Sequence, residues 1–285
     1  MVLNPYELLP NPYENLFIYY IQGVINDSNI KKASLYPDFI GNWEEDEFSF
    51  LFFSARCDEL VEKIVAQDSE LTLLDKYEMT GEAWHGEPIE SYRSGNLCIS
   101  PPWKIPFIND PKLKHILLDP GVVFGTGRHP TTEDCLKYIQ YIFSKEHISN
   151  VIDIGTGTGL LAVAAATLGC KRVLAVDFNL LAVKTAKKNI LLNSFEDKIL
   201  AIQGRAEDFI FKTADLVVAN IHYDVMRHLL EITQFFDHKW LILSGLLRSE
   251  VDRVLKKLKQ AGVKVVELSS SFDSIWTTIL VKGFK

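Results

Sequence analysis

Short runs of β-branched and aliphatic residues alternate with helical patterns over the second part of the chain. The runs end at Ile154, Val176, Ile202, Ala219, Leu243, Leu268 and Val281. Helix-compatible segments begin near Gly159, Leu180, Ala206, Val225 and Ser249. This alternation predicts a doubly wound, mostly parallel, seven-stranded Rossmann-like α/β sheet with helices on both faces. Because only six residues separate the last two runs, we expect a hairpin there and an antiparallel final strand.

The first part of the chain has a different pattern. Residues 16–21 and 48–53 are short, aromatic-rich apolar runs of the kind found in buried strands. Residues 58–66 place apolar side chains at helical spacing, with Asp58 as the expected N-cap. These elements predict a smaller α+β domain at the N-terminus.

A proline-rich stretch divides the two patterns. Four prolines occur within residues 100–111, where neither a helix interior nor a central strand can hold them. We therefore predict a first domain over residues 1–105, including a connecting segment, and a second over residues 106–285.

Composition narrows the class of protein. Hydrophobic residues make up 47% and charged residues 24% of the chain, as in ordinary globular proteins. No apolar run reaches the roughly 18 to 20 residues needed to cross a membrane, and the N-terminus lacks a basic and apolar signal sequence. We expect a cytoplasmic protein without membrane contact. Four widely spaced cysteines predict reduced, structural thiols and no metal site.

A glycine-rich loop directly follows the first run of the second domain. Gly155, Gly157 and Gly159 permit a tight turn and close approach of a ligand, in a spacing that differs from the dinucleotide fingerprint. Asp177 ends the next run, where a carboxylate can accept hydrogen bonds from ribose hydroxyls. Together they indicate a nucleoside-bearing ligand. The alternatives are an ordinary glycine turn and an aspartate that caps the next helix.

Asn220 ends the fourth run, at the sheet edge where open α/β sheets place their active sites. Its amide can hold an amine through the carbonyl oxygen, or bind the aminoacyl end of a cofactor. The alternative is that Asn220 caps the helix that begins near Val225.

The segment 118–132 precedes the sheet and combines three glycines with Phe124 and His129. Either Thr131 or Thr132 can cap the helix that follows. The segment as a whole is typical of a lid over the cofactor.

These segments together resemble the bacterial ribosomal protein L11 methyltransferase family, whose members are class I S-adenosylmethionine-dependent protein methyltransferases. The resemblance lies in residues 118–132, 155–159, Asp177 and 217–221. It covers the whole second domain and reaches Trp84, Trp103 and Trp276. Residues 1–80 match only in outline, as a substrate-recognition domain. Where the family continues Asn-Ile with Leu-Ala, this chain has His222 and Tyr223.

The resemblance implies the cofactor, the reaction and the site. S-Adenosyl-L-methionine would contact Thr132, Gly155, Asp177 and Asn220, with Gly157, Phe124, Gly125 and Thr126 lining the same pocket. The reaction would be methylation of lysine side-chain or N-terminal amines of a ribosomal protein, with Asn220 as the catalytic residue. We interpret His129 as structural and leave open whether His222 acts as a base.

A methyltransferase for nucleic-acid base amines is the first alternative, because Asn220 and Tyr223 are similar to the loop of such enzymes. A non-catalytic cofactor-binding protein is the second, and a nicotinamide oxidoreductase is disfavoured.

The charge distribution fits a basic protein substrate. Residues 1–115 carry 19 acidic and nine basic side chains, whereas the whole chain has a net charge of −7. An acidic first domain would attract a basic ribosomal protein and repel nucleic acid. We therefore expect no stable nucleic-acid partner, a monomer, and weaker substrate capture when several acidic residues at 44–47 are neutralised.

Overall fold

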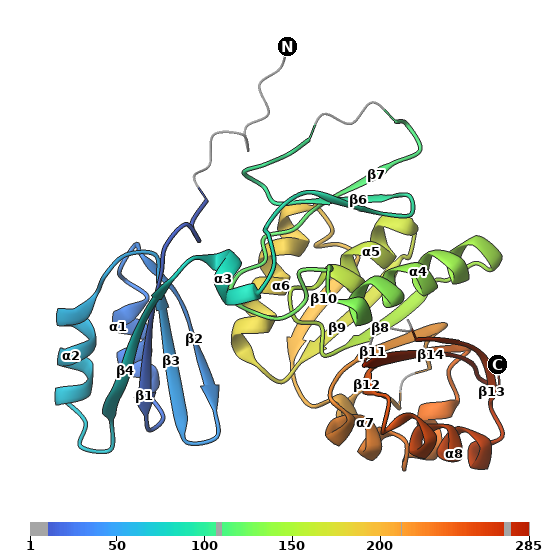
Figure 1. Ribbon diagram of the computed structural model, residues 1–285. Coiled ribbons are helices and arrows are strands. Elements are labelled where there is room, and N and C mark those ends of the chain that lie inside the picture. The colour runs from blue at the N-terminus through green and yellow to red at the C-terminus, as the bar shows by residue number, and fades with distance from the viewer. Residues whose placement is uncertain (1–10, 107–109, 212, 271–274, 285) are drawn as a thin grey trace.

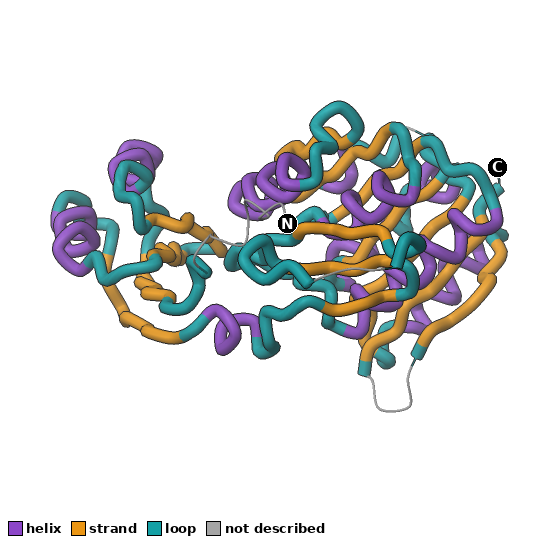
Figure 2. Tube along the Cα trace, turned by 90° about the horizontal axis from the view of Figure 1, so that it is seen from above, coloured by secondary structure: helices purple, strands orange, loops and turns teal. Residues whose placement is uncertain are grey.

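The computed structural model describes residues 11–106, 110–211, 213–270 and 275–284. Within these residues the chain forms a small N-terminal lobe and a larger C-terminal lobe that lie side by side (Figure 1; Figure 2). No helix of the described segments is long and apolar enough to cross a membrane. The four cysteines are free thiols, as predicted.

The N-terminal lobe is built on a four-stranded antiparallel sheet with the order β2-β3-β1-β4. Its elements are β1 (Leu16–Gln22), α1 (Asp27–Ala33), β2 (Phe39–Glu45), β3 (Phe48–Phe53), α2 (Asp58–Ala66) and β4 (Thr72–Met79). The strands predicted at residues 16–21 and 48–53 and the helix predicted at residues 58–66 are confirmed. The N-cap prediction was wrong: Cys57 holds that position, and the Asp58 carboxylate accepts a hydrogen bond from the Tyr19 hydroxyl at 3.0 Å instead.

A short connecting unit lies between the lobes. It comprises α3 (Gly81–His85), β5 (Tyr92–Ser94), β6 (Leu97–Ser100) and β7 (Lys114–Leu117). Strands β6 and β7 pair in parallel across the proline-rich stretch, so this small sheet includes residues from both sides of position 105. The division of the chain at that position stays a prediction.

The C-terminal lobe contains the predicted seven-stranded sheet, in the order β10-β9-β8-β11-β12-β14-β13. Its strands are β8 (Asn150–Ile154), β9 (Arg172–Asp177), β10 (Ile199–Gln203), β11 (Leu216–Asn220), β12 (Trp240–Leu247), β13 (Lys264–Ser269) and β14 (Trp276–Lys282). Strands β8 to β12 run parallel, and β14 runs antiparallel to both of its neighbours. The doubly wound sheet and its antiparallel last strand are confirmed.

Helices cover both faces of this sheet. They are α4 (Pro130–Lys145), α5 (Leu160–Leu168), α6 (Leu180–Leu192), α7 (Tyr223–Leu229) and α8 (Val251–Ala261). Along β11, Leu216 and Val218 enter the core beneath α4, α5 and α6, whereas Val217 and Ala219 enter the core beneath α7 and α8. Burial on both faces explains why the strand sequences read as nearly continuous apolar runs.

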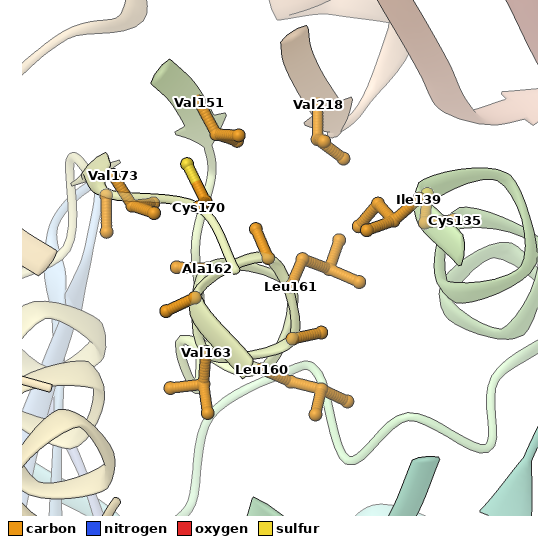
Figure 3. Packing of buried hydrophobic residues seen from close by; sticks show 14 of the residues in the cluster. Cys135, Ile139, Val151, Leu160, Leu161, Ala162, Val163, Cys170, Val173 and Val218 are labelled. Carbon is orange, nitrogen blue, oxygen red and sulfur yellow. The ribbon is translucent and has the colours of Figure 1, made fainter. Parts of the chain in front are cut away.

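Helix α5 lies in the centre of one of these cores. It is apolar around its whole circumference, as expected for a helix without a solvent face. Figure 3 shows its side chains between Val151 and Val218 of the sheet and Ile139 of α4. Burying each leucine or valine side chain of α5 contributes roughly 1.5–3 kcal/mol, so α5 fixes the loop that precedes it.

The prediction of a helix near Ala206 was wrong. Only a single 3₁₀ turn forms there, over Ala206–Asp208. The ring of Phe209 folds back against Gly204, and Ile210 enters the core, so the chain turns instead of extending a helical face. The hairpin predicted between β13 and β14 is supported by their antiparallel pairing, although residues 271–274 of its loop lie outside the described residues.

Candidate active site

A cavity of about 560 Å³ opens at the carboxyl edge of the parallel strands. Its walls come from the glycine loop after β8, the ends of β9 and β11, the loop before α4, the start of β14, and strand β2 of the N-terminal lobe. Its size is typical of small-molecule sites. Five of the predicted site residues line it: Phe124, Gly155, Gly157, Asp177 and Asn220.

The glycine loop needs its glycines because the backbone is crowded and left-handed. Gly155 has φ +68°, and a Cβ atom there would lie 2.4 Å from Ile221 Cγ2. Gly157 has φ +55°, and its Cβ would lie 2.4 Å from the carbonyl oxygen of Phe124. Any side chain at Gly157 would therefore push the lid segment away from the loop.

Asp177 ends β9 and binds the glycine loop directly. Its Oδ2 accepts a hydrogen bond from the Gly157 amide at 2.9 Å, and its Oδ1 accepts one from the Asn179 amide at 2.9 Å. Burial raises the pKa of this carboxyl above its ordinary value, while the backbone hydrogen bonds oppose that shift. The N-cap of α6 is Asn179, whose side chain accepts from the Leu181 and Ala182 amides. Asp177 is therefore not the helix cap.

Asn220 ends β11 beside the glycine loop and is half-buried. Its Nδ2 donates to the Thr132 hydroxyl at 3.3 Å, which leaves its carbonyl oxygen without a partner among the described residues. The N-cap position of α7 is taken by His222, so Asn220 does not cap that helix. Thr132 is buried below Asn220 and lies outside the cavity lining.

The segment 118–132, for which we predict the role of a lid, contacts the glycine loop and is called the lid segment. The Phe124 carbonyl accepts from the Thr158 amide at 3.1 Å, and the Gly125 carbonyl accepts from the Thr158 hydroxyl at 2.6 Å. Thr126 turns away from the cavity and binds the connecting unit instead. Its hydroxyl donates to Glu87, and its carbonyl accepts from the Tyr92 hydroxyl. The structure therefore places Phe124 at the cavity, and Gly125 and Thr126 behind its wall.

His129 is the N-cap of α4, so the expectation that Thr131 or Thr132 caps this helix was wrong. Its Nδ1 lies 2.8 Å from the Thr131 hydroxyl, and its ring packs edge-on between Phe124 and Trp276, with centroid distances of 5.3 Å to each. Burial lowers the pKa of His129 below its ordinary value. A neutral imidazole with one nitrogen engaged at the helix end fits a structural role.

Asp153 lies behind the glycine loop, out of reach of solvent. Its Oδ2 accepts from the Thr156 hydroxyl at 2.5 Å, whereas its Oδ1 has no partner among the described residues. Burial raises the pKa of this carboxyl from 3.8 to about 7. Asp153 supports the loop from below and does not face the cavity.

Several lining residues escaped the sequence analysis. Ala206 and Gly204 follow β10, and their place after a strand end was a usable signal. Trp43 and Glu45 come from β2, more than 100 residues before the glycine loop, and nothing in their local pattern indicated a site.

Comparison with known proteins identifies related chains. The family model described as ribosomal protein L11 methyltransferase (PrmA) matches residues 26–283. A ribosomal protein L11 methyltransferase from Clostridium botulinum (strain Alaska E43 / Type E3) is 37% identical over 208 residues, which cover 70% of this chain and 64% of that protein. This chain thus spans just under two thirds of that relative's length. The protein of the same name from Staphylococcus saprophyticus is 31% identical over 235 residues, covering 80% of this chain and 74% of the relative.

A solved structure agrees with these relatives. The crystal structure of a ribosomal protein L11 methylase from Lactobacillus delbrueckii subsp. bulgaricus superposes with a TM-score of 0.61 at 27% identity. The match covers 68% of this chain and 98% of that one. With the glycine loop, Asp177 and Asn220 gathered at one cavity and the family model matched over nearly the whole length, this chain belongs to the ribosomal protein L11 methyltransferase family.

Proposed function

We propose that this protein transfers methyl groups from S-adenosylmethionine to amine nitrogens of ribosomal protein L11. The observation that carries the proposal is the meeting of Gly155, Asp177 and Asn220 at one cavity, in a chain of this family. The names of the relatives supply the acceptor protein.

The residues of the cavity fit the cofactor. Asp177 presents a carboxylate that can accept hydrogen bonds from ribose hydroxyls in addition to those from the Gly157 and Asn179 amides. Gly155 and Gly157 line the cavity without side chains, so their backbone would receive the aminoacyl part together with Asn220. Phe178 and Ala206 line the cavity and would supply apolar surface for the adenine ring. Thr132 would act through its hydrogen bond to Asn220, and Gly125 and Thr126 by holding Phe124 in place.

The cofactor would supply an activated methyl group on a sulfonium, so the protein's task is to align the acceptor amine and to favour its neutral form, whose proton is released to solvent. A free lysine amine, with a pKa of about 10.4, is almost entirely protonated at neutral pH. Transfer to a largely apolar cavity favours the neutral amine. The carbonyl oxygen of Asn220 can then accept a hydrogen bond from that amine and hold its lone pair in line. Restricting the amine in this way lowers the barrier mainly by removing its rotational freedom.

The first lobe would hold the acceptor protein. Its acidic excess favours encounter with a basic ribosomal protein. The base-methylation alternative needs Tyr223 to stack on a flipped base. Tyr223 instead packs against the core beneath α7 and α8, and it is not among the described residues that line the cavity.

The test is to incubate the protein with methyl-labelled S-adenosylmethionine and a ribosomal extract, and then to count protein and RNA fractions separately. The proposal predicts label in a single small basic protein. Label in RNA would replace it with base methylation, and cofactor binding without label in either fraction would indicate a non-catalytic protein.

A further inference from the structure

We infer that strand β2 of the N-terminal lobe completes the acceptor side of the active site, with Glu45 as the group that receives the cationic amine and Trp43 as the wall beside it. This inference rests on the proposed function and names two residues for acceptor capture. Both side chains line the same cavity as Asn220 and Asp177.

The alternation of side chains along β2 separates two faces. Gly41, Trp43 and Glu45 point one way, and Asn42 and Glu44 point the other, because successive side chains of a strand alternate. Asn42 Nδ2 donates to a Glu44 carboxylate oxygen at 2.9 Å on the outer face. Glu45 therefore faces the cavity, while its neighbour Glu44 faces solvent.

The inner face of β2 is held against the C-terminal lobe by close packing. A Cβ at Gly41 would lie 2.4 Å from Leu181 Cδ1 of α6, so the strand backbone rests directly on that helix. Trp43 packs against an apolar cluster that joins Ile18 and Phe52 of the first lobe to Val123 of the lid. Glu45 follows two residues later on the same face and lines the cavity together with Trp43.

Charge decides what Glu45 can bind. No lysine or arginine is among the described residues that line the cavity. Glu45 is exposed and has no ion-pair partner within the described part of the chain. An exposed carboxylate that lines a largely apolar cavity attracts an ammonium group, and a tryptophan lining the same cavity can bind that cation through its π system. The occupant that fits is a lysine or N-terminal ammonium arriving on its protein.

The role assigned to Glu45 is capture, which acts on the encounter more than on the chemical step. Ribosomal protein L11 and S-adenosylmethionine serve as substrates for the wild type and for Glu45→Gln, with Glu44→Gln as the matched control on the outer face. For Glu45→Gln we expect KM for the acceptor to rise about threefold to tenfold, with kcat and cofactor Kd changed by less than about twofold. The rise should shrink at high salt. Glu44→Gln should leave KM within about twofold of the wild type.

Three results would overturn the inference. Equal effects of Glu45→Gln and Glu44→Gln on the acceptor KM would show that Glu45 acts only as one of several surface charges. A weaker cofactor Kd with an unchanged acceptor KM would place Glu45 on the cofactor instead. A wild-type protein that transfers no methyl group to this acceptor would refute the proposed function itself, and the acceptor role of Glu45 with it.

Discussion

Two aspartates support the glycine loop from different sides: Asp177 is half-buried, and Asp153 is fully buried. Asp177 meets the cavity, and its two backbone hydrogen bonds fix its carboxylate in one orientation. Asp153 lies beneath the loop with one oxygen unpartnered among the described residues, so the carboxyl is more stable there when it is neutral. We therefore expect Asp177 to determine cofactor affinity, and Asp153 to determine how the stability of the protein varies with pH.

Replacing Asp177 by Asn should weaken S-adenosylmethionine binding by about 10- to 100-fold, since charge-assisted hydrogen bonds contribute about 1.5–3 kcal/mol. The side-chain amide of the asparagine would also point its N–H donor at the backbone N–H of Gly157 or Asn179, so one of these two hydrogen bonds would be lost. Isothermal titration calorimetry measures the change. Asp197→Asn, at an exposed aspartate before β10, is the control and should bind as the wild type does. Equal Kd values for all three proteins would contradict the role given to Asp177.

The stability of the Asp153→Asn variant should increase relative to that of the wild type as the pH rises. The pKa of Asp153 is about 7 in the folded protein and about 3.8 when unfolded, so the native state holds the extra proton between these values. Stability therefore falls as pH rises through that window, and the substitution removes this dependence. Denaturant unfolding at pH 5 and pH 8 should show the variant gaining roughly 2–3 kcal/mol relative to the wild type. A constant difference between the two proteins would mean that Asp153 does not titrate in this window.

Among the elements, the glycine loop and the lid segment are in close contact at the site. Gly157 allows the Phe124 carbonyl to lie where a Cβ would be, and the Thr158 amide and hydroxyl bind the same stretch of lid. The loop and lid therefore form one unit, anchored beneath by the buried helix α5.

Gly157→Ala should weaken cofactor binding at least about tenfold, because both the left-handed backbone and the clash with the lid force the loop to move. Gly86→Ala is a matched control, since Gly86 has φ +70° but open space around its Cβ position. That control should lose only about 1–2 kcal/mol of stability and keep cofactor affinity. If both variants bind equally well, the lid contact does not shape the pocket.

The elements differ in how much of them could be predicted from the sequence. The parallel strands were predictable because burial on both faces leaves continuous apolar runs such as residues 216–219. Asp177 and Asn220 were predictable because each ends such a strand. The orientation of Thr126 could not be predicted, because it depends on hydrogen bonds with Glu87 and Tyr92 of the connecting unit. Trp43 and Glu45 could not be found because local pattern does not show which faces of two lobes meet.

At the scale of the whole molecule, the contact between the lobes includes a buried polar anchor. The Tyr13 hydroxyl donates to Asp119 Oδ1 at 2.6 Å, and the same carboxylate also binds Lys188 and accepts from the Gly121 amide at 2.9 Å. Together with the apolar cluster around Val122 and Val123, this anchor fixes β2 beside the cavity.

Tyr13→Phe should lower the free energy of unfolding by about 1.5–3 kcal/mol, since it removes one buried hydrogen bond to a carboxylate. It should also increase hydrogen exchange in β2 and in the lid, while leaving cofactor affinity nearly unchanged. Tyr36→Phe, at an exposed tyrosine of the same lobe, controls for the loss of a hydroxyl. Unchanged exchange in β2 would show that the anchor does not hold the lobes together.

The most direct test of the account is mass spectrometry of purified ribosomal protein L11 after incubation with S-adenosylmethionine and either the wild type or Asn220→Ala. We expect methyl additions on amine nitrogens with the wild type, and a kcat/KM lower by about 100-fold with the variant, because Asn220 holds the reacting amine. Unmodified L11 with a wild type that binds the cofactor would contradict the proposed reaction. Equal methylation by both proteins would contradict the role of Asn220.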